Sequence, residues 1–169
     1  MLITLLRNAD RVKIACLAQL VNVIAPIMTR NGGGCWAQTI FYPFMHASRY
    51  GRGKVLQGLV SCPTYACSDY DRVPYLDAVA TLEEDGSVSL FCVNRDMEED
   101  FALDVDLRAF GQLRVGEHLV LHHDDVKAVN TEEHPRNVYP TTVTGDRVDG
   151  ERASLHLPAL SWNVIRLIP

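Results

Sequence analysis

The stretch that decides the fold class is LDAVATLEEDGSVSLFCVN, at residues 76–94. In residues 76–82 apolar side chains take every second position, which is the period of a strand with one face against a core. The dipeptide Asp85-Gly86 then favours a tight turn between two strands. Residues 87–94 are again largely apolar, so the stretch predicts an antiparallel hairpin.

The chain downstream repeats this alternation. Residues 101–108 carry apolar side chains at Phe101, Leu103, Val105 and Leu107, with mostly charged side chains between them. Further strand patterns, each near turn residues, occur at 117–122, 141–144, 147–148, 153–157 and 161–168. About nine short strands separated by turn signals predict an antiparallel β-sandwich, which we place at residues 54–169.

The front of the chain has a different period. From residue 2 to residue 24 apolar side chains recur every three or four positions, which predicts one long helix. Pro26 ends this pattern, because the residue before a proline disfavours helical geometry. The short apolar run at residues 25–28 predicts a buried parallel strand.

A glycine-rich loop at residues 29–37 leads to a second predicted helix. Thr39 is its expected N-cap, and the helix is expected to end near Tyr50, before Gly51. The order helix, strand, loop, helix is the repeating unit of an α/β barrel. We therefore treat residues 1–53 as a segment distinct from the β-sandwich.

Composition and charge exclude some functions. The net charge is −5, and 47% of the residues are hydrophobic. With no basic cluster, no nucleic acid or anionic membrane partner is expected. Charges at Arg7, Asp10 and Arg11 interrupt the apolar start, which argues against a signal peptide and a membrane span. The odd count of five cysteines favours a reducing, cytoplasmic location.

Several blocks resemble one family. They are residues 8–27 (NADRVKIACLAQLVNVIAPI), Gly33-Gly34, residues 36–44 (WAQTIFYPF), 73–77 (VPYLD), 93–95 (VNR), 127–131 (KAVNT) and 134–135 (HP). Together they are similar to the C-terminal third of the intracellular α-L-arabinofuranosidases of glycoside hydrolase family 51. The resemblance covers nearly the whole chain.

This resemblance implies a mainly β fold: a jelly-roll type β-sandwich at residues 54–169, preceded by a remnant of a (β/α)8 barrel at residues 1–53. It implies an exo-acting, retaining glycosidase that removes terminal α-L-arabinofuranosyl groups from arabinan and arabinoxylan oligosaccharides. Retention needs two carboxyl groups about 5 Å apart. In the family both are glutamates on earlier barrel strands, with no matching position here. We therefore expect this chain alone to be inactive, to need no cofactor, and to belong to a homo-oligomeric parent enzyme.

The Trp-x-Gln-Thr segment carries the site prediction. By resemblance, Gln38 hydrogen-bonds the arabinose ring in the −1 subsite, and Trp36 stacks on the sugar or walls the site. A carboxamide both donates and accepts, which suits a sugar hydroxyl. The alternatives are that Gln38 caps its own helix and that Trp36 only packs. The family commonly has arginine where this chain has Ala37, so a local contact differs.

No other motif supports a catalytic or metal site. His122-His123-Asp124-Asp125 is the best metal candidate, but neighbouring strand residues point to opposite faces and no third ligand is suitably spaced. Asp104 and Asp106 are expected to be solvated. The glycine run lacks the lysine of a phosphate loop. As an alternative function, the β-sandwich is a non-catalytic module for carbohydrate binding or subunit assembly.

Overall fold

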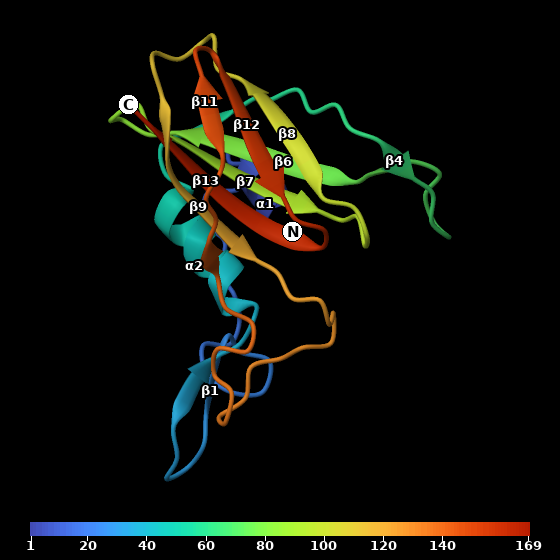
Figure 1. The fold of residues 1–169 in the computed structure, drawn as a ribbon. Coiled ribbons are helices and arrows are strands. Elements are labelled where there is room, and N and C mark those ends of the chain that lie inside the picture. The colour runs from blue at the N-terminus through green and yellow to red at the C-terminus, as the bar shows by residue number, and fades with distance from the viewer.

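The computed structural model describes residues 1–169, and its largest element is a six-stranded sheet (Figure 1). In spatial order its strands are β10 (Thr141–Thr142), β9 (Arg114–Leu121), β13 (Ser161–Ile168), β7 (Val88–Asn94), β6 (Leu76–Leu82) and β3 (Lys54–Leu56). A three-stranded sheet has the order β11 (Arg147–Asp149), β12 (Arg152–Leu157) and β8 (Phe101–Asp106). All neighbouring strands are antiparallel, so the predicted mainly β, antiparallel architecture is confirmed.

The hairpin predicted at residues 76–94 is confirmed in its register. Strands β6 and β7 pair with Leu82 opposite Val88. Gly86 has a φ of +84° in the turn, a conformation that residues with a Cβ rarely adopt. The Asp85 carboxylate accepts a hydrogen bond of 2.9 Å from the Ser87 N–H and closes the turn.

The larger hydrophobic core lies between the two sheets. Its buried members on β7 and β12 are Val88, Leu90, Cys92, Ala153, Leu155 and Leu157. Along β8 the side chains alternate between half-buried and exposed, as the pattern at residues 101–108 predicts. The two sheets thus pack face to face.

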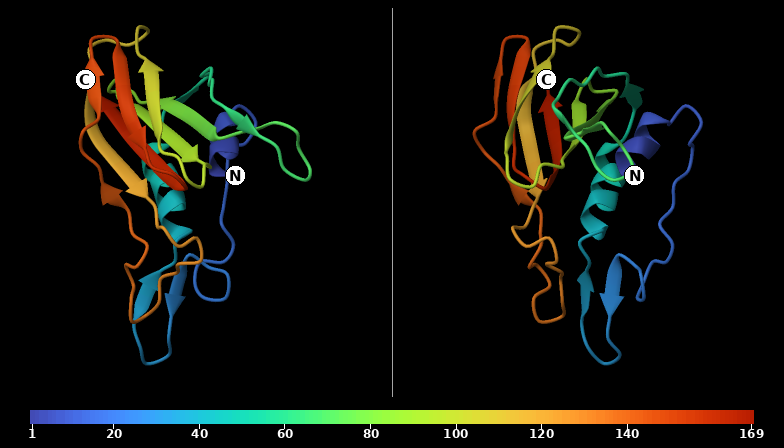
Figure 2. Two further views of the ribbon diagram at one scale, coloured as in Figure 1. Left: turned by 45° about the vertical axis from the view of Figure 1, so that its right-hand side comes forward. Right: turned by 90° about the vertical axis from the view of Figure 1, so that its right-hand side faces the viewer.

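The opposite face of the large sheet carries two helices, α1 (Leu2–Arg7) and α2 (Phe41–Tyr50). A second core joins Ile3 and Tyr42 of these helices to Phe91 and Val164 of the sheet. Figure 2 shows α2 lying along the sheet on the side away from β11 and β12. Because both of its faces are covered, β7 is almost continuously buried rather than alternating.

The predicted helix over residues 2–24 is wrong beyond its beginning, because α1 ends at Arg7. The following segment carries only an isolated bridge and descends to a small hairpin (Figure 2). Leu20 and Val23, on the apolar face of the predicted helix, are 70% and 80% exposed. An amphipathic helix is stabilised mainly by burial of its apolar face, and no part of this chain covers that face.

The predicted parallel strand at residues 25–28 is also wrong. Strand β1 (Ile27–Thr29) pairs antiparallel with β2 (Cys35–Ala37), within the stretch predicted to be a loop. Gly32, with a φ of +71°, lies in the turn between them. A parallel strand needs neighbours from elsewhere in a sheet, whereas this segment finds its partner locally across the turn.

Helix α2 is confirmed close to its predicted bounds, although its N-cap is Ile40 rather than Thr39. A Cβ on Gly51, after its last residue, would lie 2.5 Å from the Ala47 carbonyl oxygen and 2.9 Å from a Leu6 methyl group. Glycine therefore allows α1 and α2 to approach. Besides β2, three strands were not predicted: β3, β4 (Thr64–Tyr65) and β5 (Val73–Pro74). The division near residue 53 stays a prediction.

Candidate functional site

A cleft of about 600 Å³ lies beside α2, and we refer to it as the aromatic cleft. Its aromatic lining residues are Trp36, Phe41, Tyr42, Tyr50 and Tyr139. Its titratable lining residues besides tyrosine and Cys35 are His46, Arg49, Glu117 and Arg136. The cleft therefore combines flat apolar surfaces with hydrogen-bonding groups and charges of both signs, as small-ligand sites commonly do.

Asn130 holds one wall of the aromatic cleft in place. Its side chain is 1% exposed. The amide nitrogen donates to the carbonyl oxygens of Ala37 at 2.9 Å and Val138 at 3.0 Å, and the amide oxygen accepts from the Val138 N–H at 2.7 Å. The Asn130 carbonyl in turn accepts from the Trp36 indole N–H at 3.1 Å. One buried amide thus links β2 to a loop more than ninety residues away.

The glycine run next to β2 is held by Glu132. The carboxylate accepts from the Gly34 N–H at 3.0 Å and pairs with Arg30 at 2.9 Å. A Cβ on Gly33 would lie 2.7 Å from the same carboxylate, so a side chain there would displace the Glu132 carboxylate. The run acts as a turn and contact segment.

The two residues predicted as substrate-binding differ in their placement. Trp36 is half-buried and lines the aromatic cleft. Gln38 is half-buried in the connection between β2 and α2, outside the lining of that cleft. Its backbone N–H donates to the Pro26 carbonyl at 2.8 Å, and its carbonyl accepts from Phe41. The Gln38 carboxamide makes no hydrogen bond within the chain, so it does not cap its own helix.

His46 is a lining residue that the sequence analysis missed. It is 1% exposed, and its Nδ1 accepts a hydrogen bond of 3.2 Å from the Trp162 indole N–H. Because an indole only donates, the proton of the neutral ring sits on Nε2. Burial lowers the pKa of His46 to about 4, against a smaller raising effect of Glu117. The sequence did contain a signal for His46, because its spacing from Tyr42 and Tyr50 places the three residues on one face of α2.

Tyr50 connects α2 to the sheet at the inner end of this helix face. Its hydroxyl donates to Glu117 at 3.1 Å, and burial together with that carboxylate raises the pKa of Tyr50. The guanidinium groups of Arg49 and Arg166 each lie 5.2 Å from the ring centroid. Stacking of this kind orients a guanidinium group while leaving its N–H edge available.

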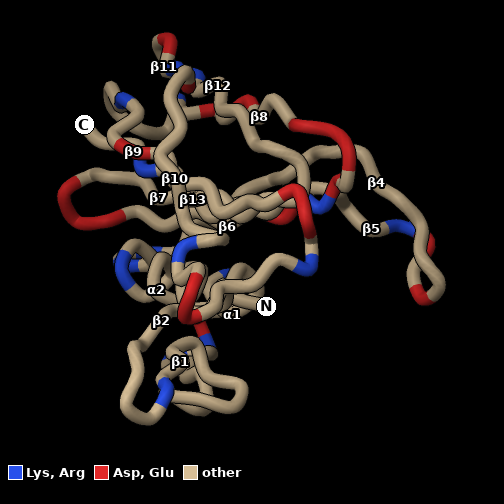
Figure 3. Tube along the Cα trace, turned by 60° about the horizontal axis from the view of Figure 1, so that its bottom comes forward, with Lys and Arg blue, Asp and Glu red and all other residues tan.

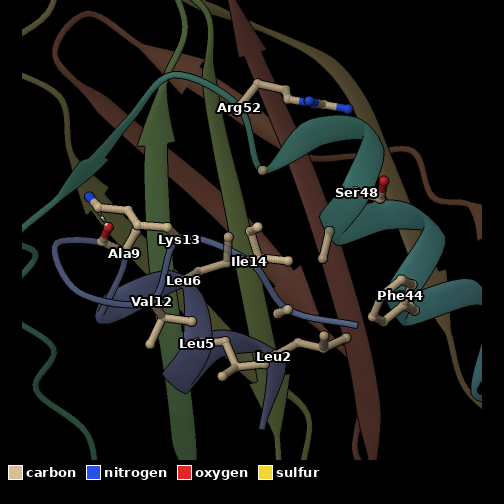
Figure 4. Close-up of a pocket in the computed structure, with 13 residues that line it drawn as sticks. Leu2, Leu5, Leu6, Ala9, Val12, Lys13, Ile14, Phe44, Ser48 and Arg52 are labelled. Carbon is tan, nitrogen blue, oxygen red and sulfur yellow. Dashed lines mark hydrogen bonds between the residues drawn. The ribbon is translucent and has the colours of Figure 1, made fainter. Parts of the chain in front are cut away.

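A second hollow, of about 420 Å³, lies between α1, residues 9–15 and α2, and we refer to it as the apolar groove (Figure 4). Leu2, Leu5, Ile14 and Phe44 are among its lining residues. Its charged lining residues are Lys13 and Arg52, and Lys13 donates to the Ala9 carbonyl at 2.8 Å. No carboxylate lines the groove, so it offers no acid–base chemistry.

The side chains that the sequence disfavoured as metal ligands or catalytic carboxylates make hydrogen bonds with residues close to them in the chain. His122 pairs with Asp124 at 3.1 Å, and His123 accepts from the Asp125 N–H at 3.0 Å. No cluster of three or more metal-ligating side chains occurs. Asp106 is bound by Arg108, whose hydrogen bonds lower the pKa of that carboxyl to about 2.

Charges on the rest of the molecule are mixed. In the view of Figure 3, Lys and Arg alternate with Asp and Glu over loops and strand edges, without a continuous basic face. None of the helices is long and apolar enough to cross a membrane.

Fold and site together define a class: an antiparallel β domain with a helical layer on its large sheet and an aromatic, polar cleft beside that layer. The family model described as "Alpha-L-arabinofuranosidase C-terminal domain" matches residues 1–161, and the chain belongs to this family. The resemblance to family 51 noted from the sequence is thereby confirmed.

Individual relatives support this assignment. The chain is 51% identical over 168 residues to the intracellular exo-alpha-(1->5)-L-arabinofuranosidase 1 of Bacillus subtilis (strain 168), covering 99% of this chain and 33% of the relative. It is 44% identical to an exo-alpha-(1->6)-L-arabinofuranosidase of Bifidobacterium longum, covering 99% of this chain and 33% of the relative. The chain thus spans about a third of the length of these relatives.

Solved structures give the same result for the fold. A family 51 alpha-L-arabinofuranosidase from Bifidobacterium longum superposes with a TM-score of 0.90 at 39% identity, covering 97% of this chain and 32% of that one. An alpha-L-arabinofuranosidase from Thermotoga maritima, solved as an arabinose complex, gives 0.82 at 26% identity, with 98% and 37% covered.

Proposed function

We propose that the chain is the C-terminal part of a retaining, exo-acting α-L-arabinofuranosidase that removes terminal α-L-arabinofuranosyl groups from arabinan and arabinoxylan oligosaccharides. The observation that carries this proposal is the match of the arabinofuranosidase C-terminal domain over residues 1–161. The names of the relatives, which specify exo-acting α-L-arabinofuranosidases, support it. The jelly-roll type of the sandwich and the origin of residues 1–53 in a catalytic barrel belong to this proposal.

Within the parent enzyme, the contribution of this chain is substrate positioning by Gln38 and Trp36. Gln38 has a carboxamide without a partner in the chain, available to a sugar hydroxyl. Retaining hydrolysis needs two carboxyl groups about 5 Å apart. The aromatic cleft is lined by one carboxylate, that of Glu117, and the apolar groove by none. We therefore propose that both catalytic glutamates lie in the remaining two thirds of the parent.

The test uses the chain alone and a chimera. The chain alone is expected to give no turnover of an aryl α-L-arabinofuranoside, and robust turnover would refute the need for further carboxylates. A chimera joins the N-terminal two thirds of the Bacillus subtilis relative to this chain and is expected to be active. There Gln38→Ala is expected to lower kcat/KM by about 10- to 100-fold, the loss of one hydrogen bond to a reacting sugar. The matched control Gln57→Ala, at an exposed position, is expected to have no effect.

We also propose self-association, as the alternative of an assembly module suggests. Exposed apolar side chains gather in residues 8–26, which we refer to as the front segment. They are Ile14, Leu20, Val23 and Ile24. Such side chains commonly find a partner surface. Light scattering of the chain is expected to show a homo-oligomer, and a monodisperse monomer would contradict this.

The proposed location is cytoplasmic. Several relatives are named intracellular enzymes. All five cysteines are free thiols, of which three are exposed, as suits a reducing compartment.

A further inference from the structure

The aromatic cleft contains more recognition chemistry than the role of Trp36 accounts for. Tyr42 and Tyr139 meet edge to face, with ring centroids 5.3 Å apart. Tyr139 is 44% exposed at the rim. Sugar rings present apolar C–H faces, and exposed aromatic rings of this kind give them a surface to stack on.

Two groups in the cleft suit hydroxyls. The Nε2–H of His46 has no partner within the chain, since only Nδ1 is engaged, by Trp162. Glu117 uses one carboxylate oxygen for the Tyr50 hydroxyl, and its other oxygen makes no hydrogen bond. A neutral N–H donor and a carboxylate acceptor in the lining of one cleft match a hydroxyl, which both donates and accepts.

Two further groups suit a carboxylate. Arg49 and Arg136 line the cleft, and neither forms an ion pair or hydrogen bond with its side chain. Each guanidinium group is instead stacked on a tyrosine ring, Arg136 on Tyr139 at 5.0 Å and Arg49 on Tyr50 at 5.2 Å. Stacking pre-orients the planar group and leaves its N–H edge available for bidentate binding of a carboxylate.

A flat apolar face, hydroxyls and one carboxylate occur together in a uronic acid. We propose that the aromatic cleft is a binding subsite for a sugar residue that carries a carboxylate. The ring packs on Tyr139 and Trp36, its hydroxyls meet His46 and Glu117, and its carboxylate meets Arg136 or Arg49. This inference concerns binding alone and does not depend on the proposed hydrolytic function.

The chain contains its own reporter for this test. It has two tryptophans, of which Trp36 lines the cleft and Trp162 is hydrogen-bonded to His46. Tryptophan fluorescence of the full 169-residue chain is titrated with a xylo-oligosaccharide bearing one glucuronic acid and, separately, with the neutral oligosaccharide of the same backbone length. The acidic ligand is expected to change the fluorescence with an affinity at least about tenfold tighter than the neutral one.

Variants locate the contact. At least one of Arg136→Gln and Arg49→Gln is expected to weaken binding of the acidic ligand about tenfold, without altering the circular dichroism spectrum. Arg72→Gln, an exposed arginine in the loop between β4 and β5, is the matched control and is expected to leave affinity unchanged. Equal affinity for the two ligands, no response up to about 10 mM, or unchanged binding in both cleft variants would overturn the proposal. Full competition by inorganic phosphate at equal concentration would also overturn it, because the site would then recognise charge alone.

Discussion

The large sheet and the front segment of residues 8–26 differ in what happens to their apolar side chains. Phe91 at the centre of the sheet is 0% exposed, whereas Ile14 in the front segment is 84% exposed. Phe91 belongs to the apolar run at residues 87–94, and Ile14 lies within the helix predicted over residues 2–24. An apolar pattern therefore becomes a regular element only where another surface covers its apolar side. Two layers cover β7, whereas Ile14, Leu20 and Val23 stay exposed.

The largest expected effect is that of removing the Phe91 ring from the covered face of the large sheet. Phe91→Ala removes a ring from the second core, where it lies beside Trp162 of the same sheet at a centroid distance of 6.0 Å. We expect unfolding free energy to fall by about 3–5 kcal/mol, measured by urea denaturation. Ile14→Ala is the control and is expected to change stability by less than about 0.5 kcal/mol. A comparable loss of stability in both variants would contradict this difference, because it would show that the front segment is packed in solution.

Lowering the pH tests whether the layer between α2 and the large sheet excludes water. Burial holds the pKa of His46 at about 4 in the folded chain, below the ordinary value of 6.5. The unfolded chain therefore binds a proton as the pH falls below 6.5, and the folded chain binds it only near 4. Stability is expected to decline across this window, by up to about 3 kcal/mol from this group.

Urea denaturation at several pH values measures this slope. In His46→Gln the part of the slope due to His46 is expected to disappear, while His134→Gln, at an exposed position, keeps it. An unchanged slope in His46→Gln would show that His46 titrates normally, and therefore that its layer is open to water.

The link from the helical layer into the sheet depends on Gly53. Its φ is +79°, and an added Cβ would lie 2.1 Å from the Leu82 carbonyl oxygen. Gly53→Ala is expected to lower stability by up to about 3 kcal/mol in thermal or urea unfolding. Gly58→Ala, where nothing lies within 4 Å of the added atom, is the matched control. Similar stability of both variants would mean that β3 is not held against β6.

The smallest expected effect concerns the hydrogen bonds by which Asn130 joins β2 to the loop after β9. Asn130→Ala leaves the buried Val138 N–H and two carbonyls without their partner. We expect a loss of about 1–3 kcal/mol and a red shift of Trp36 emission as β2 loosens. Asn31→Ala, an exposed residue of the same hairpin, is expected to leave both measurements unchanged. An unshifted spectrum in Asn130→Ala would show that β2 is held by other contacts.

Much of the β region was predictable because its signals are local. The alternation before the turn at Asp85-Gly86 and the apolar run after it predicted the β6–β7 hairpin within one short stretch. The pattern at residues 101–108 likewise predicted which side chains of β8 face the core. Helix α2 was predicted from local end signals, above all Gly51 directly after its last residue, and the sheet covers its buried face.

The site was predictable only in part. Trp36 was identified and lies in the aromatic cleft, while the substrate roles of Trp36 and Gln38 stay predictions. Asn130 and His46 were missed as site residues because their partners are far away in the chain. The Trp36–Asn130 bond spans 94 residues and the His46–Trp162 bond spans 116. No spacing rule applied to a single sequence connects positions at such distances.

The antiparallel β class, the central hairpin and the family resemblance follow from alternation, turn residues and motifs, which act over a few neighbouring positions. Three features depend on the folded molecule: residues 8–26 are not helical, residues 27–37 form a hairpin, and a cleft opens between α2 and the loop after β9. The physical reason is burial. Whether an apolar face is covered, and which polar groups meet inside, depends on surfaces that come together only after the chain has folded.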